Sequence, residues 1–218
     1  MIADRLRVVG RKTPASSWLV ICGNRTSSVT TRIYDDLGEL QLSRDHSYSA
    51  HHITSNADGD FAVSNEGGSY SYLRWYYANG SQRWSHRQWA NYYGIAMDVN
   101  GNVAAASARL WEEGSWGERI IDLRYFTAAG RNSWVYNHGG GSCYSAAIRP
   151  SNRYPIFGHQ DRMVEFTTAG SYVRATTAIK SSLAIKVHTD GTVVAAYGNY
   201  IYKRTSTFGS VWSYNHGA

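Results

Sequence analysis

The sequence predicts an all-β protein made of many short strands, and three observations support this fold class. The 218-residue chain contains 17 Tyr, 8 Trp and 5 Phe, and aromatic and β-branched residues favour strands. Its 21 glycines supply turns, whereas it has only 3 prolines. The third observation is a strand-and-turn phrase that recurs along the whole chain.

The recurring phrase places a glycine a few residues after a strand that ends in an aromatic or basic residue. Its copies are Tyr34-Asp-Asp-Leu-Gly38, Tyr76-Tyr-Ala-Asn-Gly80, Phe126-Thr-Ala-Ala-Gly130, Phe166-Thr-Thr-Ala-Gly170 and Arg204-Thr-Ser-Thr-Phe-Gly209. Successive glycines are 42, 50, 40 and 39 residues apart. A period near forty with four strands is the sequence signature of a β-propeller blade.

The other half of the phrase is an alternating strand, a turn with glycine and an apolar strand. Its clearest turns are Asp58-Gly59, Asn100-Gly101 and Asp190-Gly191. Such dipeptides between two strands predict hairpins in which both turn residues take positive φ. The fourth copy, at residues 147–157, lacks the glycine and carries prolines, and the first, at residues 6–22, is the most degenerate.

These patterns predict a single five-bladed β-propeller with four antiparallel strands per blade. We place the blades at residues 1–45, 46–88, 89–138, 139–178 and 179–218, with strands A to D running from the axis outward. The tight A–B and C–D turns then lie on one face, and the variable B–C and D–A loops lie on the other. A β-sandwich with coincidental spacing is the alternative.

The segment Val193-Val-Ala-Ala-Tyr-Gly198, continued by Ile201-Tyr202 and Gly209-Ser-Val-Trp212, resembles the repeats of pyrroloquinoline-quinone-like propellers. The pattern is shared with WD-type propellers and implies a fold rather than a function. Enzymes of the quinone family use eight blades, a quinone and calcium, which five short blades without a ligand cluster do not match. In size the chain is similar to the tachylectin sugar-binding propeller and to five-bladed glycoside hydrolases.

Charge, hydropathy and cysteine content limit the partners and the cellular location that we expect for the protein. Charged residues make up 17% of the chain, with a net charge of +6 and a pI near 9.3, which permits an acidic partner but also fits simple solubility. No apolar run reaches the length of a membrane helix, and the first residues do not resemble a signal peptide. Cys22 and Cys143 suggest buried thiols rather than a disulfide framework. We therefore expect no membrane insertion and a virion or cytoplasmic location.

Candidate binding residues fall on the variable loops, where function usually lies on a rigid scaffold. The aromatic residues among them could form a platform for a sugar, a base or a protein, or could be ordinary core. A Tyr-Asn-His-Gly tetrad occurs twice at the D–A junction, where its histidines suit intra-blade hydrogen bonds or a pH switch. The predicted ligand-binding residues are Trp89, Tyr92, Tyr93, Trp111, Trp116, Asn137, His138, Asn215 and His216.

Chemistry-bearing patterns are scarce. Asp58, Asp98 and Asp190 recur near A–B turns, but we expect Asp58 and Asp190 to be Asx turn residues rather than converging acid and base groups. His51-His52 lacks the spacing of a metal motif. Arg–aromatic runs around Trp75 and Trp84 suit nucleic acid, and better suit Arg–Trp stacking between strands. We expect no catalytic residues, no metal and no cofactor.

The sequence thus predicts a non-enzymatic binding or assembly module. Its small size, basic charge and Tyr-, Gly- and Ser-rich composition favour a virion component, such as a phage tail or capsid protein that contacts other proteins or a host surface. A sugar-binding lectin is the first alternative, and a five-bladed glycoside hydrolase is the second. Other proteins of an assembly are the expected partners, ahead of glycan and of nucleic acid.

Overall fold

The computed structural model describes residues 19–24, 29–34, 39–46, 49–67, 70–110, 119–138, 143–177, 184–215 and 217, and the regular elements in these ranges are 19 β-strands. They form four four-stranded sheets and one three-stranded sheet. Strand neighbours in each sheet are neighbours in sequence, so each sheet is an antiparallel meander. Within these ranges no helix has the length and apolarity needed to span a membrane.

The first sheet holds β1 (Leu19–Asn24), β2 (Val29–Tyr34) and β3 (Leu40–His46). The second holds β4 (Ser49–Ser55), β5 (Phe61–Gly67), β6 (Tyr70–Tyr76) and β7 (Gln82–Gln88), and the third holds β8 (Asn91–Met97), β9 (Val103–Leu110), β10 (Arg119–Phe126) and β11 (Asn132–His138). The fourth holds β12 (Cys143–Ile148), β13 (Pro155–His159), β14 (Met163–Phe166) and β15 (Tyr172–Thr176), and the fifth holds β16 (Ala184–Val187), β17 (Val193–Tyr197), β18 (Tyr200–Arg204) and β19 (Ser210–Asn215). The strand expected at residues 6–14 lies outside the described residues.

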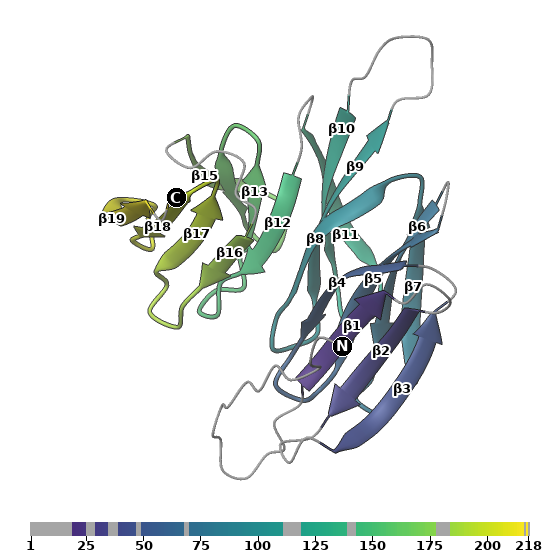
Figure 1. Cartoon of the computed structure of the whole chain (residues 1–218). Helices are drawn as coiled ribbons and strands as arrows, with labels where there is room; N and C mark the ends of the chain where they lie inside the picture. Colours follow the sequence, from purple (N-terminus) through teal and green to yellow (C-terminus); the bar gives the residue numbers. More distant parts are fainter. Residues whose placement is uncertain are drawn as a thin grey trace.

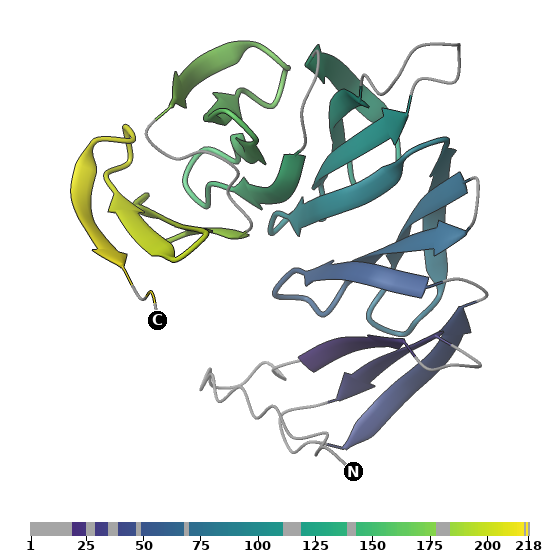
Figure 2. The ribbon, with the colours of Figure 1, turned by 45° about the horizontal axis from the view of Figure 1, so that its top comes forward.

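The five sheets are arranged in chain order as an arc, as Figures 1 and 2 show. The first strands of consecutive sheets, β4, β8, β12 and β16, lie on the inner side of the arc, and β8 packs against both β4 and β12. The first and last sheets stand apart in both views. We call the ends of the sheets with the tight hairpin turns the turn face, and the opposite ends the loop face.

The predicted hairpins are present, but their turn type differs from the prediction. In the third sheet the Asp98 N–H donates to the Asn102 carbonyl and the Gly101 N–H donates to the Asp98 carbonyl. This closes a three-residue loop in which Gly101 has φ of +81° and Asn100 does not take a positive φ. A type I turn followed by one left-handed residue therefore replaces the two-residue turn, so only the glycine needs positive φ.

Among the residues that the structure describes, two left-handed positions are not glycine. In the fourth sheet Arg153 has φ of 62°, where the sequence lacked the turn glycine. In the fifth sheet Phe208 has φ of 70°, and its N–H bonds to the Thr205 carbonyl as Gly130 does to Thr127. Phe208 rather than Gly209 is thus the structural equivalent of Gly130, and our glycine alignment was displaced by one residue in this copy.

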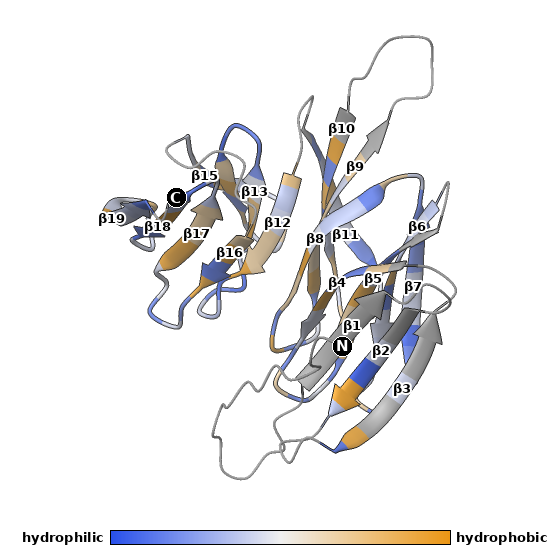
Figure 3. Ribbon diagram, in the orientation of Figure 1, coloured by the Kyte–Doolittle hydropathy of each residue, from blue (hydrophilic) through white to orange (hydrophobic). Residues whose placement is uncertain are grey.

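The hydrophobic core is divided among the four junctions between neighbouring sheets. Each junction has its own cluster of buried residues, with one set from the preceding sheet and one from the following sheet. Figure 3 shows that the strands carry both hydrophobic and hydrophilic residues. Because alternate residues of a strand point to opposite faces, each inner sheet supplies both of its faces to this series of cores.

Tryptophan side chains join three of the sheets. Trp75 and Trp84 of the second sheet donate their indole N–H groups to the carbonyls of Gly101 (2.9 Å) and Ala128 (3.1 Å) in turns of the third sheet. Trp134 of the third sheet donates to the Thr168 carbonyl of the fourth (3.0 Å). The expected Arg–aromatic stacking is also present, since Arg83 lies 4.9 Å from the Trp75 ring centroid.

Candidate functional site

A β-bulge recurs at the same place in the first strand of three consecutive sheets. The register shifts between Ala50 and His52, between Tyr92 and Gly94, and between Cys143 and Ser145. The extra residues are therefore His51, Tyr93 and Tyr144, each near the loop face. Bulges re-aim a side chain and are frequent beside functional sites.

The bulged residues gather on the inner side of the arc. The Tyr93 and Tyr144 rings have centroids 6.3 Å apart with planes at 74°. Beside this pair, a β-carbon added to Gly94 would lie 2.6 Å from Ser145 Cα. Only glycine permits so close an approach of β8 to β12, and the approach brings the two tyrosines together.

A cavity of about 190 Å³ lies near the loop face between the second and third sheets. It is lined by residues from β4, β5, β6 and β8, namely His51, Ser64, Asn65, Ser71, Asn91, Tyr92 and Tyr93. The lining combines hydroxyl, amide and imidazole groups with two aromatic rings and has no carboxylate, lysine or arginine. Such a lining suits an uncharged ligand with several hydrogen-bonding groups.

Asn65 is the buried polar anchor of the cavity wall. Its side chain is 1% exposed, and its Oδ1 accepts a hydrogen bond from Arg74 Nη1 at 3.4 Å. Its Nδ2 is buried and has no hydrogen-bond partner among the described residues. A buried amide donor without a partner costs about 1–3 kcal/mol, and a ligand acceptor in the cavity would remove that cost.

The neighbouring polar groups are already ordered by hydrogen bonds. The Ser71 hydroxyl donates to Asn91 Oδ1 at 2.8 Å, which links the second sheet to the third. The backbone N–H of His52, just after the bulge, donates to Ser64 Oγ at 3.2 Å. These bonds hold Ser64, Ser71 and Asn91 in fixed positions, so the cavity wall is pre-organised.

Tyr92 has a mainly structural position in this site. It is 3% exposed, and its hydroxyl lies 2.8 Å from His86 Nδ1 on the outer strand of the second sheet. Burial raises the pKa of Tyr92. Burial, together with the nearby Arg124 charge, lowers the pKa of His86. The contact between His86 and Tyr92 thus joins the second sheet to the third.

Trp89 lies on the connection from β7 to β8 and is 54% exposed. Its ring centroid is 4.2 Å from that of Tyr70. The guanidinium carbon of Arg87 lies over the Tyr70 ring, 4.4 Å from the ring centroid. Tyr70 and Trp89 directly precede cavity segments in sequence. They supply an exposed aromatic surface at the same end of the two sheets.

The other predicted binding residues do not join this site. Asn137 is exposed on β11, and Asn215 is exposed at the end of β19, where its Oδ1 accepts from the Gly217 N–H at 2.8 Å. His138 ends β11 opposite Ile121 in the ladder. Trp111, Trp116 and His216 lie outside the described residues. Ligand binding by all nine residues stays a prediction, and the second Tyr-Asn-His-Gly copy is on a different sheet from the first.

The carboxylates of Asp98 and Asp190 accept hydrogen bonds from residues of their own turns. Asp98 Oδ1 accepts from the backbone N–H groups of Asn100 and Asn102, and its Oδ2 accepts from Tyr125. Asp190 Oδ1 accepts from Thr192, and these bonds lower the pKa of Asp190. In the second sheet the capping acceptor is Asn56 rather than Asp58. No group of three His, Cys, Asp or Glu residues suited to a metal occurs within the described ranges.

The sequence prediction did not select His51, Ser64, Asn65, Ser71 or Asn91 as ligand-binding residues, although all five line the cavity. A signal did exist, because His51, Tyr93 and Tyr144 occupy equivalent places two to three residues into their strands. The repeat was aligned on turn glycines, which lie at the other end of each sheet. His51 and Tyr93 precede Gly59 and Gly101 by the same number of residues, whereas the fourth copy lacks the turn glycine that would have aligned Tyr144 with them.

Comparison with known proteins gives little to add to this geometry. No protein-family model matches the chain, and no curated protein matches it. Among solved structures, the chain is similar to a protein of unknown function from Bacteroides caccae, with a TM-score of 0.40 and 12% identity over 92% of this chain and 94% of the other. A similarity of that size carries no argument about function.

Proposed function

We propose that the protein is a non-enzymatic binding module whose five sheets are propeller-type blades arranged in an open arc. Its binding surface is the loop face, and its ligand in the cavity between the second and third sheets is a carbohydrate. The sheet meanders and their arrangement in an arc support this architecture. The recurring inner-strand bulges support a binding role at the loop face, because they aim side chains away from the regular ladder.

The cavity lining carries the choice of ligand. A sugar offers hydroxyl groups that both donate and accept, which complements the Asn65 amide N–H and the hydroxyls of Ser64 and Ser71. Its apolar ring face suits Tyr93. The absence of a charged side chain other than an ionisable imidazole disfavours phosphate or carboxylate ligands. A volume below the ~300–1,000 Å³ of drug-sized sites indicates one sugar ring.

A glycan-array screen followed by titration calorimetry tests the proposal. Asn65→Ala removes the unpartnered donor, and we expect the affinity for the best glycan to fall about tenfold, the value of one hydrogen bond of ~1.4 kcal/mol. Asn137→Ala is the matched control, since it removes the same amide from an exposed position outside the cavity. The absence of any glycan binding by the wild-type protein would refute the carbohydrate proposal.

An assembly role, with a phage tail or capsid as its setting, is the second candidate function. The observation that favours it is an uncovered aromatic surface on the fifth sheet, where Trp212 is 44% and Tyr214 is 60% exposed. Co-purification with a large particle is the test. If the protein always separated from such particles during purification, at every concentration tested, the assembly role would be contradicted.

A further inference from the structure

Neighbouring sheets are joined by a tryptophan that recurs at one register position. Trp84 lies opposite Trp75 on the outer strand of the second sheet, and Trp134 lies opposite Tyr125 on the outer strand of the third. Each donates its indole N–H to the turn between the third and fourth strands of the following sheet. In both sheets the pair that contains this tryptophan is the last one before the register shift between the third and fourth strands, counted toward the turn that joins those strands.

Trp212 occupies the same register position on the fifth sheet. It lies opposite Lys203, and the outer ladder shifts register between Lys203 and Arg204. Unlike Trp84 and Trp134, which are partly buried against a following sheet, Trp212 is 44% exposed. Tyr214 is on the same face, two residues further along β19, and is 60% exposed. Trp212 is therefore placed like the tryptophans that join neighbouring sheets, but no sheet of the described part of the chain packs onto it.

On β17 the residues of this fifth-sheet face are less buried than those of its opposite face. Val193 and Ala195 of β17 point toward the fourth sheet and are 0% and 1% exposed. Val194 and Ala196, which alternate with them, are only partly buried. In the inner sheets the corresponding positions of both faces are buried, as Ala104, Ala105 and Ala106 of β9 illustrate.

The first sheet has the complementary free face. Ile33 of β2 is 0% exposed and packs with Phe61 and Val63 of the second sheet. Tyr34 and Leu40 pair across the β2–β3 ladder on the other face, and Leu40 is 52% exposed. Tyr34 ends β2 as Tyr76 ends β6, and Tyr76 is buried against the first sheet. Tyr34 and Leu40 therefore lie on the face that corresponds to the one the second sheet turns toward its predecessor.

Two junctions of the arc, between the second and third sheets and between the third and fourth, are packed too tightly to change their angle freely. A β-carbon on Gly130 would lie 2.6 Å from Trp84 Cγ, and one on Gly170 would lie 2.7 Å from Trp134 Cγ. Such contacts fix the angle between neighbouring sheets, since packed interfaces deform little. Closing the arc would require changes at several junctions, whereas a second copy can offer its first sheet without any.

We propose that the Trp212–Tyr214 face of the fifth sheet is an interaction surface for the first sheet of a second copy of this chain. The contact continues the sheet-to-sheet interface that already occurs four times within one chain. It is heterologous, so each copy keeps one free end and the contact generates dimers and longer chains or a closed ring. The proposal does not depend on the carbohydrate cavity, which lies in another junction.

Sedimentation velocity over a wide concentration range tests this surface. We expect the mass of the wild-type protein to rise with concentration beyond that of the monomer. Trp212→Ala and Leu40→Asp, which alter the two complementary faces, are each expected to remain monomeric. Tyr172→Ala is the matched control, because Tyr172 is 59% exposed on the fourth sheet and lies away from both faces; it should associate as the wild type does.

Mixing the two variants makes the test specific. Trp212→Ala retains an intact first sheet and Leu40→Asp retains an intact fifth sheet, so an equimolar mixture should form a dimer and nothing larger. A wild-type protein that stays monomeric at all concentrations would overturn the proposal. If the wild type were monomeric and a soluble quencher could not reach Trp212, the first sheet of the same chain would cover the face. That result would also contradict association through this face. Unchanged glycan binding in both variants would keep this test separate from that of the cavity.

Discussion

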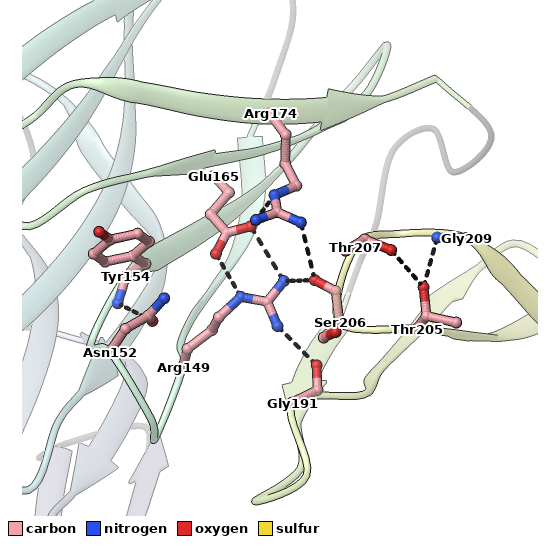
Figure 4. Close-up of polar contacts among 10 residues, drawn as sticks. All are labelled: Arg149, Asn152, Tyr154, Glu165, Arg174, Gly191, Thr205, Ser206, Thr207 and Gly209. Carbon is pink, nitrogen blue, oxygen red and sulfur yellow. Dashed lines mark hydrogen bonds and ion pairs between the residues drawn. The ribbon is translucent and has the colours of Figure 1, made fainter.

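The junction between the third and fourth sheets and the junction between the fourth and fifth sheets use the same kind of backbone acceptor but different side-chain donors. At the first, Trp134 donates to the Thr168 carbonyl. At the second, the Ser206 carbonyl holds the equivalent turn position, and it accepts from Arg149 Nη2 at 2.6 Å and from Arg174 Nη1 at 3.4 Å. Figure 4 shows this arginine junction.

The arginine junction is organised around one buried carboxylate. Glu165 is fully buried and bonds to Arg149 Nε and Nη2, and to Arg174 Nε at 3.0 Å. Arg149 Nη1 also donates to the Gly191 carbonyl at 2.7 Å. Glu165 lies opposite Arg174 in the ladder, so this pair occupies the positions of Tyr125 and Trp134 in the preceding sheet.

The turn residue changes with the donor. Where a tryptophan joins the sheets, the left-handed turn position is Gly130 or Gly170, because the indole ring occupies the space of a β-carbon. Where arginines join them, that position is Phe208, which is 5% exposed and lies 5.6 Å below the Arg149 guanidinium carbon. The same backbone arrangement therefore forms a junction through either a tryptophan or a pair of arginines. The left-handed turn residue is glycine beside the indole ring and phenylalanine beside the guanidinium group.

Arg149→Met should break the arginine junction with the largest effect. It leaves the buried Glu165 with one partially exposed partner and removes the donors to two carbonyls. Removing one member of a buried ion pair costs about 3–5 kcal/mol, and we expect a loss of that size in the free energy of unfolding. Urea denaturation followed by tryptophan fluorescence measures it.

Arg174→Met is the matched control for this change, because the Arg174 side chain is 34% exposed, compared with 4% for Arg149. Its loss should be clearly smaller. The double variant Arg149→Met, Glu165→Leu should recover part of the stability, since no charge is then left buried. Equal losses for the two arginine variants would show that burial does not govern this junction.

Gly170→Ala should damage the tryptophan junction by about 2–3 kcal/mol, the sum of overpacking and of a left-handed alanine. The new β-carbon would lie 2.7 Å from Trp134 Cγ at a φ of +86°. Gly198→Ala separates the two causes, because Gly198 has φ of +52° and nothing within 4 Å of the added atom. If both variants lost the same stability in thermal unfolding, the ring contact would contribute nothing.

Trp134→Phe should cost about 1 kcal/mol beyond the small loss of ring area, since it removes one indole donor and leaves the Thr168 carbonyl unpaired. Trp212→Phe makes the same chemical change on the uncovered fifth sheet. Measured by urea denaturation at low protein concentration, it should leave stability unchanged. A comparable loss at Trp212 would mean that its indole N–H is already engaged within one chain.

Much of the fold followed from the sequence because its signals are local. Gly101 after Asn100, or Gly170 at the end of a turn, marks a chain reversal whatever the rest of the chain does. The four-stranded sheets lie between the repeat boundaries for this reason. The turn type was missed, since the three-residue loop differs from a two-residue loop only in how Asp98 pairs with Asn102.

The site and the arginine junction depend on residues far apart in sequence, so they could not be derived in the same way. Arg149 lies in the degenerate fourth copy, yet its acceptors Gly191 and Ser206 are 42 and 57 residues away. The bulges at His51 and Tyr93 are properties of a ladder register rather than of a motif. Of the predicted binding residues, Tyr92 and Tyr93 line the cavity, Tyr92 as a buried residue, whereas Trp89 lies outside the lining.

The smallest expected effect concerns pH at the junction of the second and third sheets. Burial and the Arg124 charge lower the pKa of His86 in the folded protein below its usual value of 6.5. The unfolded chain therefore binds this proton more readily, so stability is full above pH 6.5 and falls as pH is lowered through that value toward the folded pKa. His86→Gln, which keeps a hydrogen-bonding partner for Tyr92, should reduce the slope of the unfolding free energy against pH between about pH 7.5 and about pH 5, measured by urea titrations. Part of the slope should remain, because burial and His51 also lower the pKa of His52. An unchanged slope would place the pH dependence elsewhere and leave the His86–Tyr92 bond as a contact that tolerates protonation.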